Sequence, residues 1–212
     1  ALFTGFYSEQ FFQQVSDLKP ENILLDEHLH IKLTDFGTAK RIGTDTNGSL
    51  PFDVIHFLAR SNSFVGTAEY VSPELLNDKV TPKGIVQFEM KIIASSDLWA
   101  LGCIIYQMIT GRPPFRGLNE YIIFGKVSSG KFEYPKDFPE VARDLIDKLL
   151  VLPFLVFSHR EGSDPEKRLG IGPSGYKEIK EHPFFKGIDF ENAHKQTPPP
   201  MKPYTPKLLF EE

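Results

Sequence analysis

Two short apolar runs near the N-terminus, separated by a polar turn, constrain the fold of this chain most. The runs are ILL at residues 23–25 and IKL at residues 31–33, and the residues between them are DEHLH. Strand-like runs on either side of a polar turn predict an antiparallel hairpin. Such a hairpin brings Asp17 and Asn22, which precede it, to the same edge as Asp35, which follows it. The sequence therefore predicts two carboxylates and one amide at one place.

Three short motifs of different composition surround this hairpin and follow it. They are DLKPEN at 17–22, TDFG at 34–37 and SPE at 72–74. In this order they resemble the catalytic loop, the magnesium-binding motif and the end of the activation segment of a protein kinase. The resemblance implies an enzyme that transfers the γ-phosphate of ATP to a hydroxyl group, with Mg²⁺ as the metal.

Longer matches narrow the resemblance. The matching sequences are SFVGTAEYVSPE at 63–74, SSDLWALGCIIY at 95–106, DPEKRLG at 164–170, HPFF at 182–185 and QTPP at 196–199. Together they resemble the phosphoinositide-dependent kinase family, which belongs to the AGC group of serine/threonine kinases. The resemblance covers most of residues 17–204 and implies protein substrates, in particular the activation loops of other AGC kinases.

The resemblance also implies roles for the residues around the hairpin. Asp17 would accept the proton of the substrate hydroxyl, and Lys19 would meet the γ-phosphate. Asn22 and Asp35 would each hold magnesium. Thr67 would form a hydrogen bond toward Asp17, which is typical of a Ser/Thr kinase rather than a Tyr kinase. ATP and Mg²⁺ are therefore the expected cofactors.

The resemblance also implies roles for residues that would bind the substrate, hold the lobe together or regulate it. Glu21, which we place at the cofactor site with Lys19, would meet basic side chains of the substrate, although a solvated carboxylate is the simpler alternative. Glu74 and Arg168 would form a buried structural ion pair. Asp97 would accept backbone N–H groups of the catalytic loop. Ser63 stands at the family's activation-loop phosphorylation position, where a phosphate would pair with basic side chains.

The two residues before Asp17 depart from the family pattern. The family has His and Arg there, but this chain has Val15 and Ser16. Loss of the Arg removes the usual partner of a phosphate on Ser63, and loss of the His removes a packing group beneath Asp35. A non-catalytic interaction module, similar to a pseudokinase, is therefore the alternative interpretation. A glycine-rich loop and a strand lysine upstream of the chain would favour the enzyme.

After the hairpin the pattern is mainly helical. Helices are predicted at 73–77, 95–110, 119–128, 139–152 and 176–181. Ser95 or Ser96 is a suitable cap for the longest helix, and Gly111 is suited to end it. We expect an α+β, mainly helical fold that resembles the C-terminal lobe of a kinase. No glycine-rich loop or strand lysine precedes it, so we expect the N-terminal lobe to be missing and the isolated chain to transfer little phosphate.

A sequence that imitates a phosphate-binding loop lies far from the hairpin. GIGPSG at 170–175 has the G-x-G-x-x-G spacing, but it follows KRL rather than a strand and opens no βαβ unit. We therefore predict a turn.

The expected organisation has three parts: a truncated or mispredicted remnant at 1–16, the lobe at 17–186 and a proline-rich tail at 187–212. Three apolar stretches fit no kinase template, at about 50–59, 84–93 and 153–163. Exposed loops rich in Phe, Val and Ile are unfavourable. We interpret these stretches as translated introns, with genuine insertions as the alternative.

Composition restricts the remaining function classes. The 212 residues carry a net charge of −4 and no dense Lys/Arg block, so nothing points to nucleic acid or an anionic membrane as a partner. The apolar run at 98–109 is shorter than the roughly 18 residues of a membrane span. A single Cys103 and no targeting segment fit the cytoplasm. His56 and His159 have no ligand-spaced partners for a metal, and the oligomeric state stays open.

Overall fold

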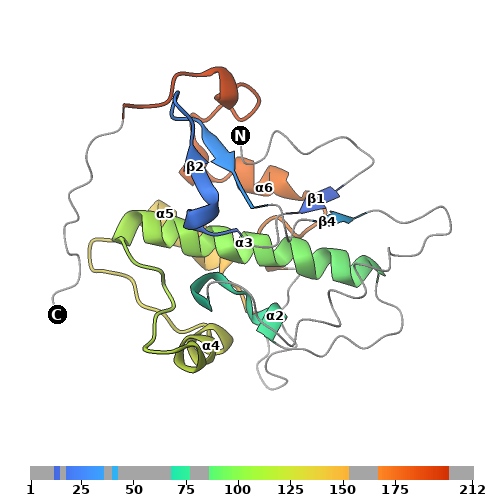
Figure 1. Ribbon diagram of the computed structural model, residues 1–212, viewed down its shortest axis with the longest axis vertical. Helices are drawn as coiled ribbons and strands as arrows, with labels where there is room; N and C mark the ends of the chain where they lie inside the picture. The colour runs from blue at the N-terminus through green and yellow to red at the C-terminus, as the bar shows by residue number, and fades with distance from the viewer. Residues whose placement is uncertain are drawn as a thin grey trace.

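The computed structural model describes residues 12–14, 18–35, 40–42, 68–76, 86–152 and 167–200, with the backbone alone for 12–14, 40–42 and 86–93 (Figure 1). Asp17, Ser63 and Thr67 lie outside the described residues. So do the expected apolar stretches at 50–59 and 153–163, and the part of the tail beyond residue 200. The predictions on those residues stay predictions.

The predicted hairpin is confirmed. Strand β2 (Ile23–Leu25) pairs antiparallel with β3 (Ile31–Leu33), and Ile23 lies opposite Leu33. The turn between them is closed by Asp26, whose carboxylate accepts hydrogen bonds from the backbone N–H groups of His28 and His30, each at 2.9 Å. A short 3₁₀ helix, η1 (Pro20–Asn22), leads directly into β2. Local polar chemistry therefore fixes the register that the two apolar runs suggest.

A second two-stranded sheet was not predicted. Strand β1 (Phe12–Gln14) pairs antiparallel with β4 (Lys40–Ile42), and Phe12 lies opposite Ile42. The two strands flank the hairpin in sequence, and Figure 1 shows them side by side at one end of α3. The pairing adds backbone hydrogen bonds between segments that have no strong strand pattern of their own.

The longest helix, α3 (Val86–Thr110), begins earlier than predicted. The expected start at Ser95 or Ser96 is wrong, and so is the assignment of most of the stretch at 84–93 to a loop. The segment from Val86 to Ser95 contains no Gly or Pro, so nothing in it interrupts a helix. The end of the helix is confirmed, since Gly111 has a φ of 77° and its N–H donates to the carbonyl of Gln107.

The remaining helices pack around α3. They are α2 (Pro73–Leu76), α4 (Glu120–Ser129), α5 (Glu140–Leu149) and α6 (Tyr176–Lys180), with 3₁₀ turns η3 (Ala68–Tyr70), η6 (Pro183–Phe185) and η7 (Ala193–Lys195). Each of these four α-helices matches a predicted one, with ends that differ by at most three residues. The mainly helical α+β class is confirmed.

The hydrophobic core lies between α3 and α5. Trp99 and Cys103 of α3 and Leu145 and Leu149 of α5 are fully buried. The two helices approach closely at Gly102, where a Cβ would lie 2.9 Å from a methyl group of Leu150. Gly102 therefore lets α3 and the end of α5 approach closely, because a side chain there would have to displace Leu150.

The GIGPSG sequence is a turn, as predicted. Gly170 and Gly175 have φ values of 93° and 53°, and the segment leads into the short helix α6. A Cβ at Gly170 would lie 2.5 Å from the Ile179 side chain, so close packing and the left-handed backbone account for this glycine.

One residue of the predicted tail, Gln196, contacts the hairpin. The His30 side chain forms a 3.0 Å hydrogen bond through Nε2 with the carbonyl of Gln196, and residues 196–200 form no helix or strand. The proline-rich tail predicted at 187–212 stays a prediction. Within the described ranges, no helix has the length and apolar character needed to cross a membrane.

Candidate active site

The hairpin brings the segments of Asn22 and Asp35 together. The backbone N–H of Thr34 donates to the carbonyl of Asn22 at 2.9 Å, and the Thr34 hydroxyl donates to the same oxygen at 3.4 Å. Asn22 ends η1, is buried, and donates its own N–H to the carbonyl of Lys19. Asp35 follows Thr34 directly. The two predicted magnesium ligands therefore stand on neighbouring backbone segments whose spacing is set by hydrogen bonds.

The backbone of Asp35 is unusual. Its φ of 55° lies in the left-handed region, where a residue with a Cβ is disfavoured by about 1–2 kcal/mol. Asp tolerates this conformation better than most residues, and such strain tends to occur at functional sites. The side chain is exposed. Asp35 therefore lies at the surface, after the end of β3, rather than packed in the core.

Two further predicted residues flank this pair. Lys19 is half-buried at the start of η1, and Glu21 is exposed within it. Burial, and after it the negative charge of Glu21, raises the pKa of Tyr70 in η3 to about 12. Glu21 therefore lies near the Tyr70 side chain. The Tyr70 hydroxyl donates to the side-chain amide oxygen of Gln107 on α3. Glu21 thus lies near the surface where η1, η3 and α3 meet.

Glu74 and Arg168 form the buried ion pair that the sequence suggested. Arg168 Nη1 lies 2.5 Å from Glu74 Oε1, and the two side chains are 0% and 8% exposed. The same guanidinium contacts the carbonyl and the hydroxyl of Ser95 at 2.6 and 2.5 Å, and donates to the carbonyl of Val151 at 2.7 Å. It also lies over the Trp99 ring. One cation therefore joins α2, α3 and the segment after α5.

Sequence reasoning missed part of this cluster. Ser95 was interpreted as a helix cap, but its hydroxyl and carbonyl serve Arg168 instead. The hydroxyls of Ser72 and Ser96 form a buried 2.8 Å hydrogen bond that joins the start of α2 to α3. Asp97 follows Ser96 and is half-buried. Its proposed hydrogen bonds to the catalytic loop stay a prediction, and the sequence carried no signal for the serine pair.

The candidate metal ligands are few. Among the residues that the structure describes, no three His, Cys, Asp or Glu side chains are grouped so as to hold a metal ion. Asn22 and Asp35 supply one amide oxygen and one carboxylate. A site with so few protein ligands suits an ion that takes its other ligands from water and from phosphate groups.

Known proteins are similar to this chain over most of its length. Residues 13–185 match the family model described as protein kinase domain. The chain is 49% identical over 193 residues to 3-phosphoinositide-dependent protein kinase 1 of Rattus norvegicus and 48% identical over 193 residues to that of Homo sapiens. It is 45% identical over 192 residues to serine/threonine-protein kinase ksg1 of Schizosaccharomyces pombe. These alignments include 91%, 91% and 89% of the chain but 29%, 29% and 28% of the relatives, so the chain spans less than a third of their length.

Proposed function

Because the chain belongs to the protein kinase family, and within the AGC group to the phosphoinositide-dependent kinases, we propose that it forms the C-terminal lobe of a serine/threonine protein kinase. The lobe would contribute the catalytic loop and the magnesium ligands, and the reaction would transfer the γ-phosphate of ATP to Ser or Thr of a protein. The mainly helical fold with one hairpin at the catalytic loop supports this assignment.

The observation that carries the proposal is the joined pair of Asn22 and Asp35. Hydrogen bonds from Thr34 hold the two segments together, and Asp35 is kept in a left-handed conformation. An amide oxygen and a carboxylate are the hard oxygen ligands that Mg²⁺ prefers, so the residues fit the metal. Asn22 and Asp35 would hold magnesium bound to ATP, and the metal would neutralise charge on the phosphates.

The chain's other polar residues would position the substrates. Asp17 would orient the substrate hydroxyl and accept its proton, and Lys19 would place a positive charge beside the γ-phosphate. Thr67 would hold Asp17 in place by a hydrogen bond. Glu21, exposed on η1, would meet a basic side chain of the substrate.

The substrates that we propose are activation loops of other AGC kinases, and we propose the cytoplasm as the site of action. Both rest on the resemblance to the phosphoinositide-dependent kinases. We also propose that Ser63 is phosphorylated. Because Val15 and Ser16 stand where the family has His and Arg, a phosphate on Ser63 would need a partner other than that Arg.

A phosphotransfer assay with matched variants tests the proposal. The protein encoded by the full transcript would be incubated with labelled ATP, Mg²⁺ and serine-containing activation-loop peptides. Asp35→Ala should lower incorporation by at least about 100-fold, since it removes a ligand of the metal that stabilises the transferred phosphoryl group. The control is Asp137→Ala, which removes a carboxylate that is also exposed but lies just before α5. Equal incorporation by the two variants would refute the assignment of Asp35.

A non-catalytic interaction module is the second candidate. The departures at Val15 and Ser16, immediately before Asp17, favour it. In that case the full protein would bind partner kinases while incorporating no label, and Asp35→Ala would leave partner binding unchanged.

A further inference from the structure

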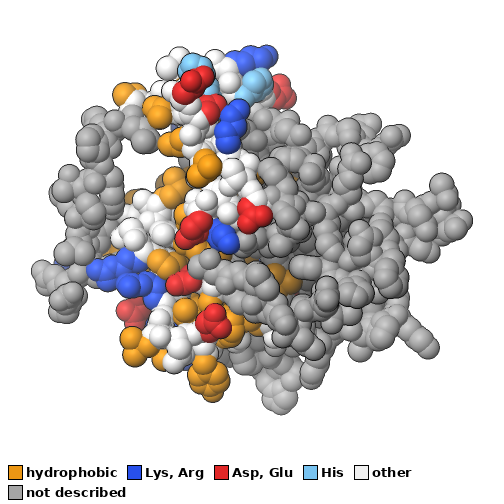
Figure 2. All heavy atoms as spheres, in the orientation of Figure 1, with side chains coloured by type: hydrophobic (Ala, Val, Ile, Leu, Met, Phe, Trp, Pro, Cys, Tyr) orange, Lys and Arg blue, Asp and Glu red, His pale blue; other side chains and the backbone are white. Residues whose placement is uncertain are grey.

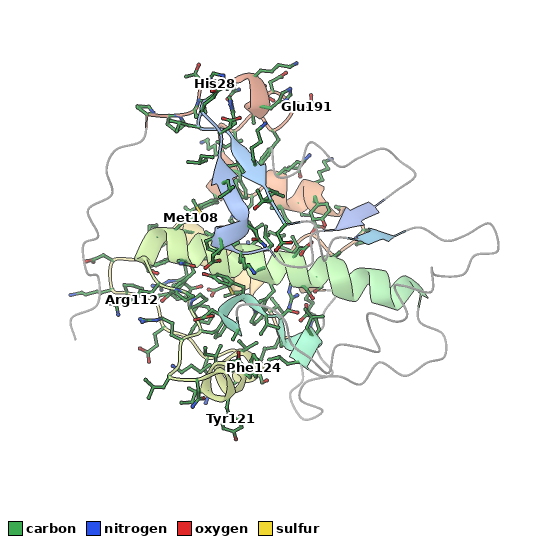
Figure 3. All side chains as sticks on the ribbon, viewed as in Figure 1. His28, Met108, Arg112, Tyr121, Phe124 and Glu191 are labelled. Carbon is green, nitrogen blue, oxygen red and sulfur yellow. The ribbon has the colours of Figure 1, made fainter. Side chains whose placement is uncertain are left out.

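Helix α4 is apolar on two opposite faces. Its inner face is buried, with Ile123 5% and Val127 0% exposed, and α4 contacts α2 and η3. Its outer face is also apolar, because Leu118, just before the helix, is 97% exposed, Tyr121 is 86% exposed and Ile122 is 37% exposed. Figure 3 shows Tyr121 pointing away from the molecule, and Figure 2 shows hydrophobic side chains at the surface over α4. A helix that is apolar all round is normally buried all round, so the outer face has the composition of an interface.

The outer face carries a row of residues at helical spacing. We call this the outer row, and it consists of Leu118, Tyr121, Ile122 and Gly125. The Asn119 side chain fixes the start of the helix, because it accepts a hydrogen bond from the Ile122 N–H at 3.0 Å. The residue before such a cap often packs against the fourth residue of the helix, which is the buried Ile123. Leu118 instead extends into solvent, where a partner can cover it.

The fold does not require a glycine at position 125. Glycine in the middle of a helix lowers its stability relative to alanine, because a more flexible backbone has to be ordered. The φ of Gly125 is not in the left-handed region, and an added Cβ would have nothing within 4 Å. Neither its backbone conformation nor its packing therefore accounts for this residue. It leaves a stretch of the outer row without a side chain, which lets the backbone of another helix approach closely.

One border of the outer row is basic. Lys126 lies about one helical turn after Ile122, and its ammonium group donates to the Arg116 carbonyl at 2.7 Å. That acceptor carries no charge, and the ammonium has further N–H donors. Lys126 and Arg116 are both exposed. Glu120 is exposed as well, but it lies five residues before Gly125, about 140° around the helix from it. The border therefore carries two cations, and this carboxylate lies on another side of α4.

We propose that the outer row of α4 binds an α-helix of a partner protein, which has apolar side chains at helical spacing and carboxylates along one flank. The backbone of the partner helix passes over Gly125, and its apolar side chains cover Leu118 and Tyr121. Its carboxylates face Lys126 and Arg116. The basic border disfavours a second copy of this chain, because an antiparallel two-fold pair of α4 helices would bring the same border of both copies together. Figure 1 places α4 and the hairpin on opposite sides of α3, so this site is separate from the candidate active site.

Fluorescence anisotropy with a designed helical peptide tests the proposal. The probe is a labelled peptide of Leu, Ala, Glu and Gln, with its leucines on one face of the helix and its glutamates beside them. One control peptide has the same composition but distributes the leucines around the helix, and a second replaces each Glu by Lys. The probe should bind the full protein at least about tenfold more tightly than either control. Equal binding of the probe and either control would overturn the proposal.

Gly125→Leu localises the binding. The new side chain would occupy the place of the partner backbone, so it should weaken probe binding at least about tenfold. The thermal unfolding temperature should not fall, because leucine is a better helix former than glycine and nothing lies within 4 Å of the new Cβ. The control is Val141→Leu, which adds bulk at a 48% exposed position of α5 and should change binding less than about twofold. Equal binding by the two variants would overturn the proposal.

A charge-reversal pair tests the basic border. Arg116→Glu should weaken probe binding several-fold, because it replaces an attraction by a repulsion. Lys195→Glu makes the same charge change at an exposed residue of η7 and should change binding less than about twofold. Equal weakening by both variants would show a general charge effect and contradict the proposed contact.

Other occupants are compared with the probe under the same conditions. They are vesicles of anionic phospholipid, a single-stranded RNA and a second copy of the protein, which is measured by analytical ultracentrifugation. Tighter binding of the vesicles or the RNA than of the probe, or a dimer that Gly125→Leu dissociates, would overturn the proposal. All binding is measured without ATP and Mg²⁺, so a failure of the proposed kinase function would leave these results unchanged.

Discussion

Removal of Glu74 should destabilise the protein strongly. The Arg168 guanidinium is completely buried, and Glu74 is the carboxylate that contacts it, with Oε1 at 2.5 Å from Nη1 and Oε2 at 3.3 Å from Nη2. In Glu74→Ala the Ser95 and Val151 carbonyls remain as acceptors, but the positive charge loses its counter-ion. Breaking a buried pair in this way costs about 3–5 kcal/mol of unfolding free energy.

A graded series separates charge from hydrogen bonding. Glu74→Gln keeps an acceptor at nearly the same position and should cost less than Glu74→Ala, about 1–3 kcal/mol. Lys148→Ala is the control, because Lys148 pairs with Asp144 at 2.7 Å but the two side chains are 47% and 53% exposed. An exposed pair of this kind contributes about 0–1 kcal/mol.

Urea denaturation followed by circular dichroism gives the three free energies. The double variant Glu74→Ala with Arg168→Met should cost less than the sum of the two single changes, because removal of both partners leaves no uncompensated buried charge. A cost for Glu74→Ala equal to that of Lys148→Ala, or strict additivity in the double variant, would refute the reasoning.

Three other predictions concern packing and titration. Gly102→Ala should destabilise the protein by about 1–3 kcal/mol, since the new Cβ would lie 2.9 Å from Leu150. Gly125→Ala should instead stabilise α4 by about 0.5–1 kcal/mol, because no atom lies within 4 Å of the new Cβ. Thermal unfolding compares the two variants, and a loss of stability in both would contradict the packing argument. Burial raises the pKa of Cys103 far above its ordinary value, so a thiol reagent at pH 8 should react only as the protein unfolds, and rapid labelling of the native protein would exclude the buried position. Hydrogen bonds from Lys148 and then His182 lower the pKa of Asp144, so its contribution to stability should be complete above about pH 4 and decline as the pH falls through the lowered value. Asp144→Asn should flatten that part of the curve of unfolding free energy against pH, and an unchanged curve would show that the carboxylate does not contribute.

The hairpin and most helices could be predicted because their signals are local. ILL and IKL stand on either side of a polar turn, and the run at 139–152 has a helical period that matches α5. The start of α3 could not be placed, because the apolar residues at 84–93 fit no kinase template and are interpreted as a translated intron, although their residue types are also compatible with a helix. The sheet of β1 and β4 depends on pairing between distant segments, which no local pattern predicts.

Some features of the candidate site could likewise be predicted from the sequence, and others could not. Asn22 and Asp35 follow from motif spacing, and the pairing of Glu74 with Arg168 follows from the family resemblance. The contacts of Arg168 with Ser95 and Val151 do not follow from either, because a carbonyl acceptor can belong to any residue type and a serine hydroxyl suits many positions. Tertiary packing alone decides which of these groups meets the guanidinium.

Nucleotide binding by the full protein tests the central claim most directly. Isothermal titration with ATP, with and without Mg²⁺, would compare the unmodified protein with Asp35→Asn and with the Asp137→Asn control. If Asn22 and Asp35 hold the metal, Mg²⁺ should strengthen ATP binding to the unmodified protein and to Asp137→Asn, and this gain should be lost in Asp35→Asn. An equal gain from Mg²⁺ in all three proteins would contradict the claim that Asp35 is a magnesium ligand.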